Sequence, residues 1–153
     1  MKQLIPAFFL CALLAACHND AAPRKADDPE EAAREFVRAS LDGNYDKALF
    51  YLYKDSMNVN QMILDKWKAD YDQLPNADKV NFKDASIIVK SIDKVNDSAS
   101  LFNYSNSYKN TQQTIKVIHH GGEWLVDLKD PFTNNMGSTI DSLMHQADTT
   151  GHH

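Results

Sequence analysis

The chain has 153 residues, of which 43% are hydrophobic and 24% are charged, and its formal net charge is −5 at pH 7. An acidic chain has no basic surface for the phosphates of a nucleic acid, so nucleic-acid binding is set aside. The length allows one domain with its own hydrophobic core.

The first sixteen residues predict a secretory signal peptide. Lys2 supplies a positive charge, and the apolar run "LIPAFFLCALLAA" follows. A transmembrane helix needs about 20 apolar residues, so this run is too short to span a bilayer. Ala15 and Ala16, directly before Cys17, resemble the lipobox of bacterial lipoprotein signals. The resemblance implies cleavage before Cys17 and lipidation of this residue; the alternative is an ordinary signal peptide with an incidental cysteine.

Lipidation of Cys17 would anchor the mature chain stably to a membrane, since two or more acyl chains are attached. Cys11 lies in the segment that is removed, so the mature chain would have no free thiol. Disulfides, thiolate catalysis and cysteine-ligated metals are then excluded. The next residue is His18, not the aspartate associated with inner-membrane retention in enteric bacteria. We therefore expect a bacterial cell-envelope protein, with the outer membrane favoured.

The remaining chain divides into three segments. The polar stretch "HNDAAPRKADD" has no apolar period and predicts a lipidated tether at 17–28. Eleven extended residues would reach roughly 35 Å from the membrane. An α+β domain is expected at 29–130. The tail at 131–153 would hold a short helix that begins at Ser138.

Three helices are predicted at the start of the domain. Asp28 is a suitable N-cap before Pro29, and Gly43 is a suitable stop. Asn44 caps a shorter helix through "YDKALFYLY". A third helix, which ends at Pro75, has one apolar stripe made of Ile63, Trp67, Tyr71 and Leu74.

Four strands are predicted after the helices: "ASIIVKSIDKV", "SASLFNYSNSY", "TQQTIKVIHH" and "EWLVDL". A two-residue turn at 121–122, Gly-Gly, would pair His119 with Trp124 and His120 with Glu123. Turns at 96–97 and 109–110 would continue an antiparallel meander in which Tyr104 lies beside Val89 and Ile115. A one-residue slip at either of these two turns would exchange the faces of the sheet.

The predicted register gives the sheet two unlike faces. The face toward the helices carries Ile87, Val89, Phe102, Tyr104, Ile115, Val117, His119, Trp124, Val126 and Leu128. The outer face carries an apolar patch of Ile88, Ile92, Leu101, Ile118 and Leu125, which is unusual on a monomer. Either the tail covers this patch with Ile140, Leu143 and Met144, or two domains pair sheet to sheet. We expect a weak homodimer.

The order of elements resembles a known family. The stretch "DDPEEAAREFVRASLDGNYDKALFYL", a long meander and then "GGEWLVDL" are similar to small bacterial lipoproteins with a domain of unknown function from the nuclear-transport-factor-2-like superfamily. The likeness covers approximately residues 29–128. It implies a cystatin-like cone, in which a curved sheet wraps around helices, often with a pocket at the open end. It implies no single activity, because the superfamily includes enzymes, binding modules and dimerisation domains.

His119 and Trp124, with Tyr104 and Trp67, are the candidate pocket residues. A histidine inside a cone could bind a ligand or exchange a proton near neutral pH. The alternative is ordinary packing, which also produces a mostly apolar face with one polar group. His119 and His120 form a poor metal motif, because adjacent strand residues point to opposite faces. No metal site and no cofactor is predicted.

Two functions remain open. No motif assigns a catalytic role to any of the residues that could reach a cavity, namely Tyr45, Asp46, Tyr51, Tyr71 and Tyr104. The first function is non-catalytic binding of a small apolar ligand or an envelope protein. The second is a small isomerase-like or dehydratase-like enzyme that performs acid–base chemistry on an apolar substrate. A pocket with two titratable groups in hydrogen-bond reach would favour the enzyme. A space filled by Phe36, Trp67 and Trp124 would favour binding.

Overall fold

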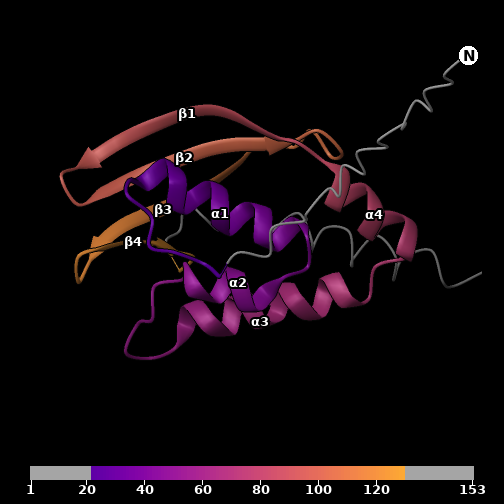
Figure 1. Ribbon diagram of the computed structural model, residues 1–153, viewed down its shortest axis with the longest axis horizontal. Helices are drawn as coiled ribbons and strands as arrows, with labels where there is room; N and C mark the ends of the chain where they lie inside the picture. The colour runs from indigo at the N-terminus through magenta and orange to yellow at the C-terminus, as the bar shows by residue number, and fades with distance from the viewer. Residues whose placement is uncertain (1–21, 130–153) are drawn as a thin grey trace, which may run out of the picture.

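The computed structural model describes residues 22–129, which form helices and one antiparallel sheet (Figure 1). The elements in chain order are α1 (Pro29–Leu41), α2 (Tyr45–Phe50), α3 (Val59–Asp72), α4 (Asn76–Asp84), β1 (Ile87–Asn96), β2 (Ala99–Asn106), β3 (Gln113–His120) and β4 (Glu123–Asp127). The predicted α+β class is confirmed. The predicted signal peptide, Cys17 and the tail lie outside the described residues.

Helix α1 is the central element of the domain. Its N-cap is Asp28, whose carboxylate accepts the N–H of Glu31 at 2.8 Å. In Figure 1 the helix lies between the sheet and helices α2 and α3, and it contacts all four strands. Phe36 is buried on α1, with its ring centroid 6.2 Å from that of Trp67 on α3. This aromatic contact joins the two helices to one core.

The predicted stop of α1 at Gly43 agrees with the structure. Gly43 has a φ of 73°, a backbone conformation that favours glycine. A Cβ atom at this position would lie 2.5 Å from Cε1 of Tyr71 on α3. Only glycine therefore allows the chain to turn here with α3 packed so closely.

The four strands form a meander in the order β1-β2-β3-β4, and β1 and β2 curve over α1 (Figure 1). The register of the last hairpin is confirmed, since His119 pairs with Trp124 and His120 with Glu123. The pairing of Val89 with Tyr104 is also confirmed. Six of the side chains predicted to face the helices are buried: Phe102, Tyr104, Ile115, Val117, Val126 and Leu128.

The predicted register between β2 and β3 is wrong. Ile115 pairs with Phe102, and Tyr104 pairs with Gln113, a shift of two residues. The connecting loop is wider than a two-residue turn, because the side-chain oxygen of Asn106 accepts the N–H groups of Tyr108 at 3.1 Å and Lys109 at 2.9 Å. A shift of two residues leaves each side chain on its predicted face.

A β-bulge in β1 overturns the predicted position of Ile92. The register shifts between Val89 and Ser91, so that Ile92 pairs with the buried Phe102. Opposite residues of an antiparallel pair share a face, and one extra residue exchanges the faces beyond it. Ile92 therefore belongs to the face toward the helices, and the predicted outer patch loses one member.

A polar cluster occupies the part of the outer face where Ile92 was predicted to lie. Asn103 Nδ2 donates to Ser91 Oγ at 3.0 Å and to Asp93 Oδ2 at 2.7 Å. Thr114 Oγ1 donates to Asn103 Oδ1 at 2.6 Å. The cluster separates Ile88 from the other apolar residues of this face. These are Leu101, Ile118 and Leu125, which we call the outer strip.

Helix α4 is additional to the three predicted helices. None of its residues is buried. It is attached instead by surface contacts, such as the hydrogen bond from the Tyr108 hydroxyl to Asp78 Oδ1 at 2.7 Å. Tyr108 also places its ring edge-on against Phe82, with 5.0 Å between the ring centroids.

Candidate functional site

Residues 22–28, the last part of the predicted tether, lie against the domain, and we call them the leader segment. The Tyr51 hydroxyl donates to the carbonyl oxygen of Arg24 at 3.0 Å. Ala26 is 9% exposed and belongs to the hydrophobic core. The Lys25 ammonium pairs with Glu123 at 2.6 Å, and the Arg24 guanidinium pairs with Glu31. The leader segment thus contacts α1, β4 and the residue that follows α2.

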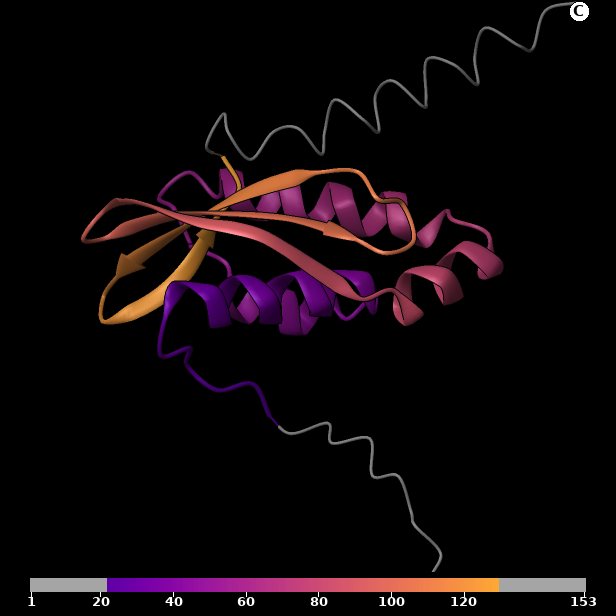
Figure 2. The ribbon, with the colours of Figure 1, turned by 90° about the horizontal axis from the view of Figure 1, so that it is seen from above.

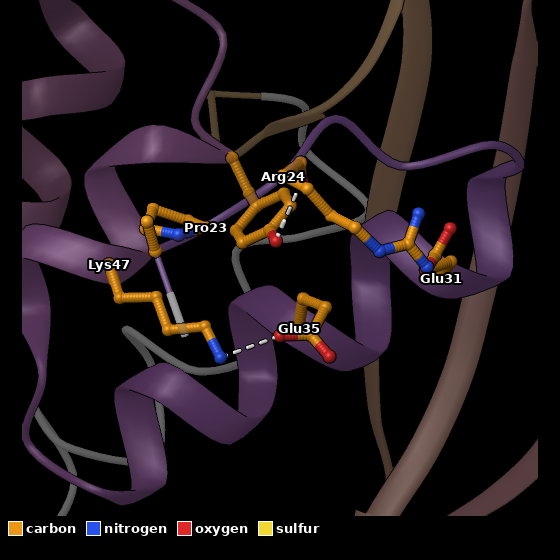
Figure 3. A pocket seen from close by; sticks show the side chains of 7 residues that line it. Pro23, Arg24, Glu31, Glu35 and Lys47 are labelled. Carbon is orange, nitrogen blue, oxygen red and sulfur yellow. Dashed lines mark hydrogen bonds and ion pairs between the residues drawn. The ribbon is translucent and has the colours of Figure 1, made fainter. Parts of the chain in front are cut away.

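A first surface pocket, the leader pocket, lies between the leader segment and helices α1 and α2 (Figure 3). Its volume is about 240 Å³, and it is lined by Ala22, Pro23, Arg24, Glu31, Glu35, Lys47 and Tyr51. Lys47 Nζ lies 2.7 Å from Glu35 Oε2, and Arg24 is paired with Glu31. Because both cations of the pocket already have a carboxylate partner, it is poorly suited to bind an anion.

A second surface pocket, the hairpin groove, lies between residues 50–54 and the β3–β4 hairpin. Its volume is about 270 Å³, and it is lined by Phe50, Leu52, Tyr53, Lys54, His120, Glu123 and Leu125. Residues 51–53 are held beside β4, since Tyr53 N–H donates to Val126 O at 2.9 Å and Val126 N–H donates to Tyr51 O at 2.8 Å. Backbone hydrogen bonds therefore fix both walls of the groove.

The hairpin groove combines an apolar surface with a single imidazole. Leu52 is buried at 2% exposure, whereas Phe50 is 41% exposed. The His120 ring lies edge-on to the Tyr53 ring, with 5.0 Å between the ring centroids. Leu125 pairs with Ile118 of the outer strip, so the groove and the strip are continuous. This arrangement offers an apolar contact surface with polar groups at its border.

The four candidate pocket residues from the sequence line neither of these pockets. Trp67 and Tyr104 are buried members of the core. Trp124 packs against the core, and its ring centroid lies 4.8 Å from that of His119. A pocket formed by all four residues stays a prediction.

The tyrosines considered for acid–base chemistry serve structural roles. The Tyr45 hydroxyl donates to the Trp67 carbonyl oxygen at 3.2 Å, and the Tyr51 hydroxyl holds the leader segment. Burial raises the pKa of Tyr104. Burial, and then the nearby Tyr71, also raises the pKa of Tyr45. These hydroxyls stay protonated at neutral pH, so they are poor candidates for a general base.

The adjacent histidines diverge as strand geometry requires. The His119 ring contacts Trp124, whereas the His120 ring contacts Tyr53. Within residues 22–129, no group of three or more histidine, cysteine or acidic side chains is arranged to hold a metal ion. In the same range, no helix has both the length and the apolar character that a membrane span requires.

The sequence offered one signal for the hairpin groove. The run "YDKALFYLY" carries more aromatic residues than a short amphipathic helix buries, and Phe50 and Tyr53 are the ones that reach the groove. On β3 and β4 the groove uses His120 and Leu125, which the predicted register had already placed on the outer face. The meeting of these two segments depends on the pairing of 51–53 with β4, for which the sequence carries no signal.

Comparisons with known proteins assign no family. No family model matches the chain, and no curated protein matches it. Among solved structures, the chain is similar to an NTF-2-like protein of unknown function from Shewanella oneidensis MR-1. The two are 12% identical with a TM-score of 0.44, and the match covers 63% of this chain and 89% of that chain. The cone and the superfamily therefore remain expectations beyond the α+β arrangement itself.

Proposed function

We propose that the protein is lipid-anchored in the bacterial cell envelope and that its domain binds an envelope protein without catalysing a reaction. The anchor is supported by the lipobox-like Ala15, Ala16 and Cys17. The binding role is supported by one main observation, the open hairpin groove. Its Phe50 side chain is 41% exposed, and the groove continues into the outer strip. The outer strip itself is half-buried, so Phe50 is the exposed centre of this apolar surface, and exposed apolar surface commonly marks a contact site.

The open position of the groove favours a protein as the ligand. Sites for small molecules are usually clefts or cavities that bury most of the ligand's surface. The hairpin groove measures about 270 Å³ and lies open at the surface. An inserted side chain of a partner protein fits such a depression better than an enclosed small molecule does. The apolar centre and the polar border of Lys54, His120 and Glu123 also match the usual anatomy of a protein interface.

The interior of the domain supports binding over the enzyme alternative. Phe36 and Trp67 are both buried, and their rings contact at an interplanar angle of 59° between α1 and α3. His120 and Glu123 are the imidazole and the carboxylate of the hairpin groove, but the Glu123 carboxylate pairs with Lys25 at 2.6 Å. An acid–base enzyme would need such a pair to be free for its substrate.

The anchor is tested with Cys17→Ser in the full-length protein. The wild type should incorporate labelled palmitate and sediment with membranes, and Cys17→Ser should lose both properties. The matched control is Cys11→Ser, which alters a thiol within the segment predicted to be removed and should change neither property. A wild type that is soluble and unlabelled would show that the anchor is wrong.

The binding role is tested with Phe50→Asp in protein purified from its source and examined by native mass spectrometry. We expect a partner protein to remain bound to the wild type and its affinity to fall at least tenfold in the variant, as for a central interface residue. Met62→Asp is the control, because Met62 is 67% exposed on α3 and lines neither pocket. Detection of a bound small molecule, or of a second copy of the chain alone, would contradict the proposal that the domain binds another envelope protein.

A further inference from the structure

We infer that the docked leader segment holds the α1–α2 side of the domain against the lipid bilayer and leaves the outer face of the sheet directed away from it. This inference rests on the proposed lipid anchor. It concerns the orientation of the domain, which the anchor alone does not fix.

The reach of the tether decides the orientation. Only five residue steps separate Cys17 from Ala22, which lines the leader pocket. At about 3.6 Å per residue, this connection spans at most ~18 Å. A free tether through Asp28 would reach roughly twice as far. Docking of the leader segment therefore shortens the free chain between the lipid anchor and the domain by about half, which restricts how far the domain can rotate.

The leader segment leaves the domain on a defined side. In Figure 2 it departs from α1 on the side opposite to the strands, and the sheet lies beyond α1. Its first residues line the leader pocket together with Glu35 of α1 and Lys47 of α2 (Figure 3). The outer strip lies on the face of the sheet that points away from α1. With the leader docked, the membrane is close to the surface around Glu35 and Lys47 that lines the leader pocket, and the outer strip, on the opposite face of the sheet, remains accessible.

Buried contacts provide most of the docking. Arg24 and Lys25 are 67% and 70% exposed, and exposed ion pairs contribute at most about 1 kcal/mol each. Ala26 in the core and the hydrogen bond from the Tyr51 hydroxyl to the Arg24 carbonyl oxygen are less accessible to water. Tyr51→Phe with Ala26→Asp should therefore release the leader segment, because it removes the hydroxyl and places a charge in the core.

Single-cysteine labels can measure the orientation, since the mature chain has no free thiol of its own. Asp46→Cys places a fluorophore at an exposed position of α2, one residue before Lys47 of the leader pocket, and Thr111→Cys places one in the exposed loop between β2 and β3. The full-length lipidated variants are incorporated into vesicles of phosphatidylethanolamine and phosphatidylglycerol with an acceptor-labelled lipid. We expect energy transfer from position 46 to exceed that from position 111 at least threefold.

Release of the leader segment should remove this difference. The double variant Tyr51→Phe and Ala26→Asp should bring the two transfer efficiencies within a factor of 1.5 of each other (an order-of-magnitude expectation from the doubled reach). A second release variant, Tyr51→Phe alone, removes only the hydroxyl that donates to the Arg24 carbonyl oxygen, so it keeps the fold if the first variant does not. Equal transfer from the two positions with the leader intact, or an unchanged ratio in a folded release variant, would overturn the inference.

Failure of the anchor is distinguished by palmitate incorporation, which is measured on the same samples. Unlabelled protein that does not associate with vesicles contradicts the proposed anchor. Labelled protein with equal transfer from both positions contradicts only the orientation. Trypsin provides a check without lipid: in soluble Cys17→Ser, cleavage after Arg24 should be about tenfold faster with Tyr51→Phe, because local opening exposes the bond. An unchanged cleavage rate would mean that the leader segment is not held by Tyr51.

Discussion

Replacement of Asn60 with alanine is expected to lower the free energy of unfolding by about 3 kcal/mol. Asn60 lies near the start of α3 and is 0% exposed. Its Nδ2 donates to the Tyr53 carbonyl oxygen and to Asp127 Oδ1, each at 3.0 Å. Its Oδ1 accepts the N–H of Lys129 at 2.9 Å. One side chain therefore connects α3, the 51–53 segment and the end of β4.

The effect is large because alanine leaves several of these partner groups without their amide partner. A buried polar group that loses its hydrogen bond costs about 1–3 kcal/mol. Asp55 does not compensate, since its carboxylate accepts the backbone N–H groups of Met57, Val59 and Asn60. These hydrogen bonds, led by that of Asn60, lower the pKa of Asp55 and cap the start of α3.

Urea unfolding of the soluble Cys17→Ser protein, followed by circular dichroism, measures this loss. The matched control is Asn81→Ala, because Asn81 is exposed on α4 and its replacement should change stability by no more than about 0.5 kcal/mol. A loss below about 1 kcal/mol for Asn60→Ala would mean that water or a shifted backbone satisfies the amide's partners.

The elements that were predicted correctly from the sequence carry a repeated pattern of apolar residues together with a cap or turn residue. Helix α1 combines a cap, a proline and one apolar face, and the last hairpin combines Gly121-Gly122 with alternating side chains. Both agree with the structure in their bounds or register. Helix α4 lacks such a pattern, because none of its residues is buried. A helix that is attached only by contacts at its surface buries no apolar face, so its sequence has no apolar periodicity.

The register errors have a different cause. The bulge between Val89 and Ser91 and the wide loop closed by Asn106 depend on local hydrogen bonds. Neither changes the composition of the strands, so periodicity alone cannot reveal them. The result differs in the two places: the loop shifts β3 by two residues and keeps its faces, whereas the bulge moves Ile92 to the other face.

The candidate sites were the least predictable part. The leader segment is polar, and it docks through a backbone carbonyl oxygen and one alanine, Ala26. Neither feature distinguishes it from a free tether in the sequence. The hairpin groove depends on a short pairing between Leu52 and Val126, which are far apart in the chain. A site that is assembled by backbone contacts between distant segments has no recognisable motif in the sequence.

Arg38→Met is expected to lower the free energy of unfolding by about 2 kcal/mol and to loosen α4. Arg38 Nη1 donates to the Ala85 carbonyl oxygen at 2.6 Å, and Nη2 donates to those of Phe82 at 3.2 Å and Lys83 at 3.1 Å. Phe82 and Lys83 lie in the last turn of α4, where carbonyl groups lack the usual partners within the helix, and Ala85 is the C-cap, whose N–H also donates to the Phe82 carbonyl oxygen at 3.2 Å. The guanidinium satisfies them and places a positive charge at the negative end of the helix.

Methionine keeps the aliphatic stem of Arg38 and removes both its capping donors and its ion pair with Asp42 at 2.9 Å, so the control must remove an ion pair of the same spacing. The matched control is Arg34→Met, one turn earlier on α1, where the guanidinium makes an exposed ion pair with Glu30 at 2.7 Å. Such a pair contributes about 0.3–0.5 kcal/mol. Hydrogen exchange should show faster exchange across α4 in Arg38→Met and unchanged exchange in Arg34→Met. Equal effects of the two substitutions would mean that α4 is held by its contact with Tyr108 instead, because that contact is the same in both variants.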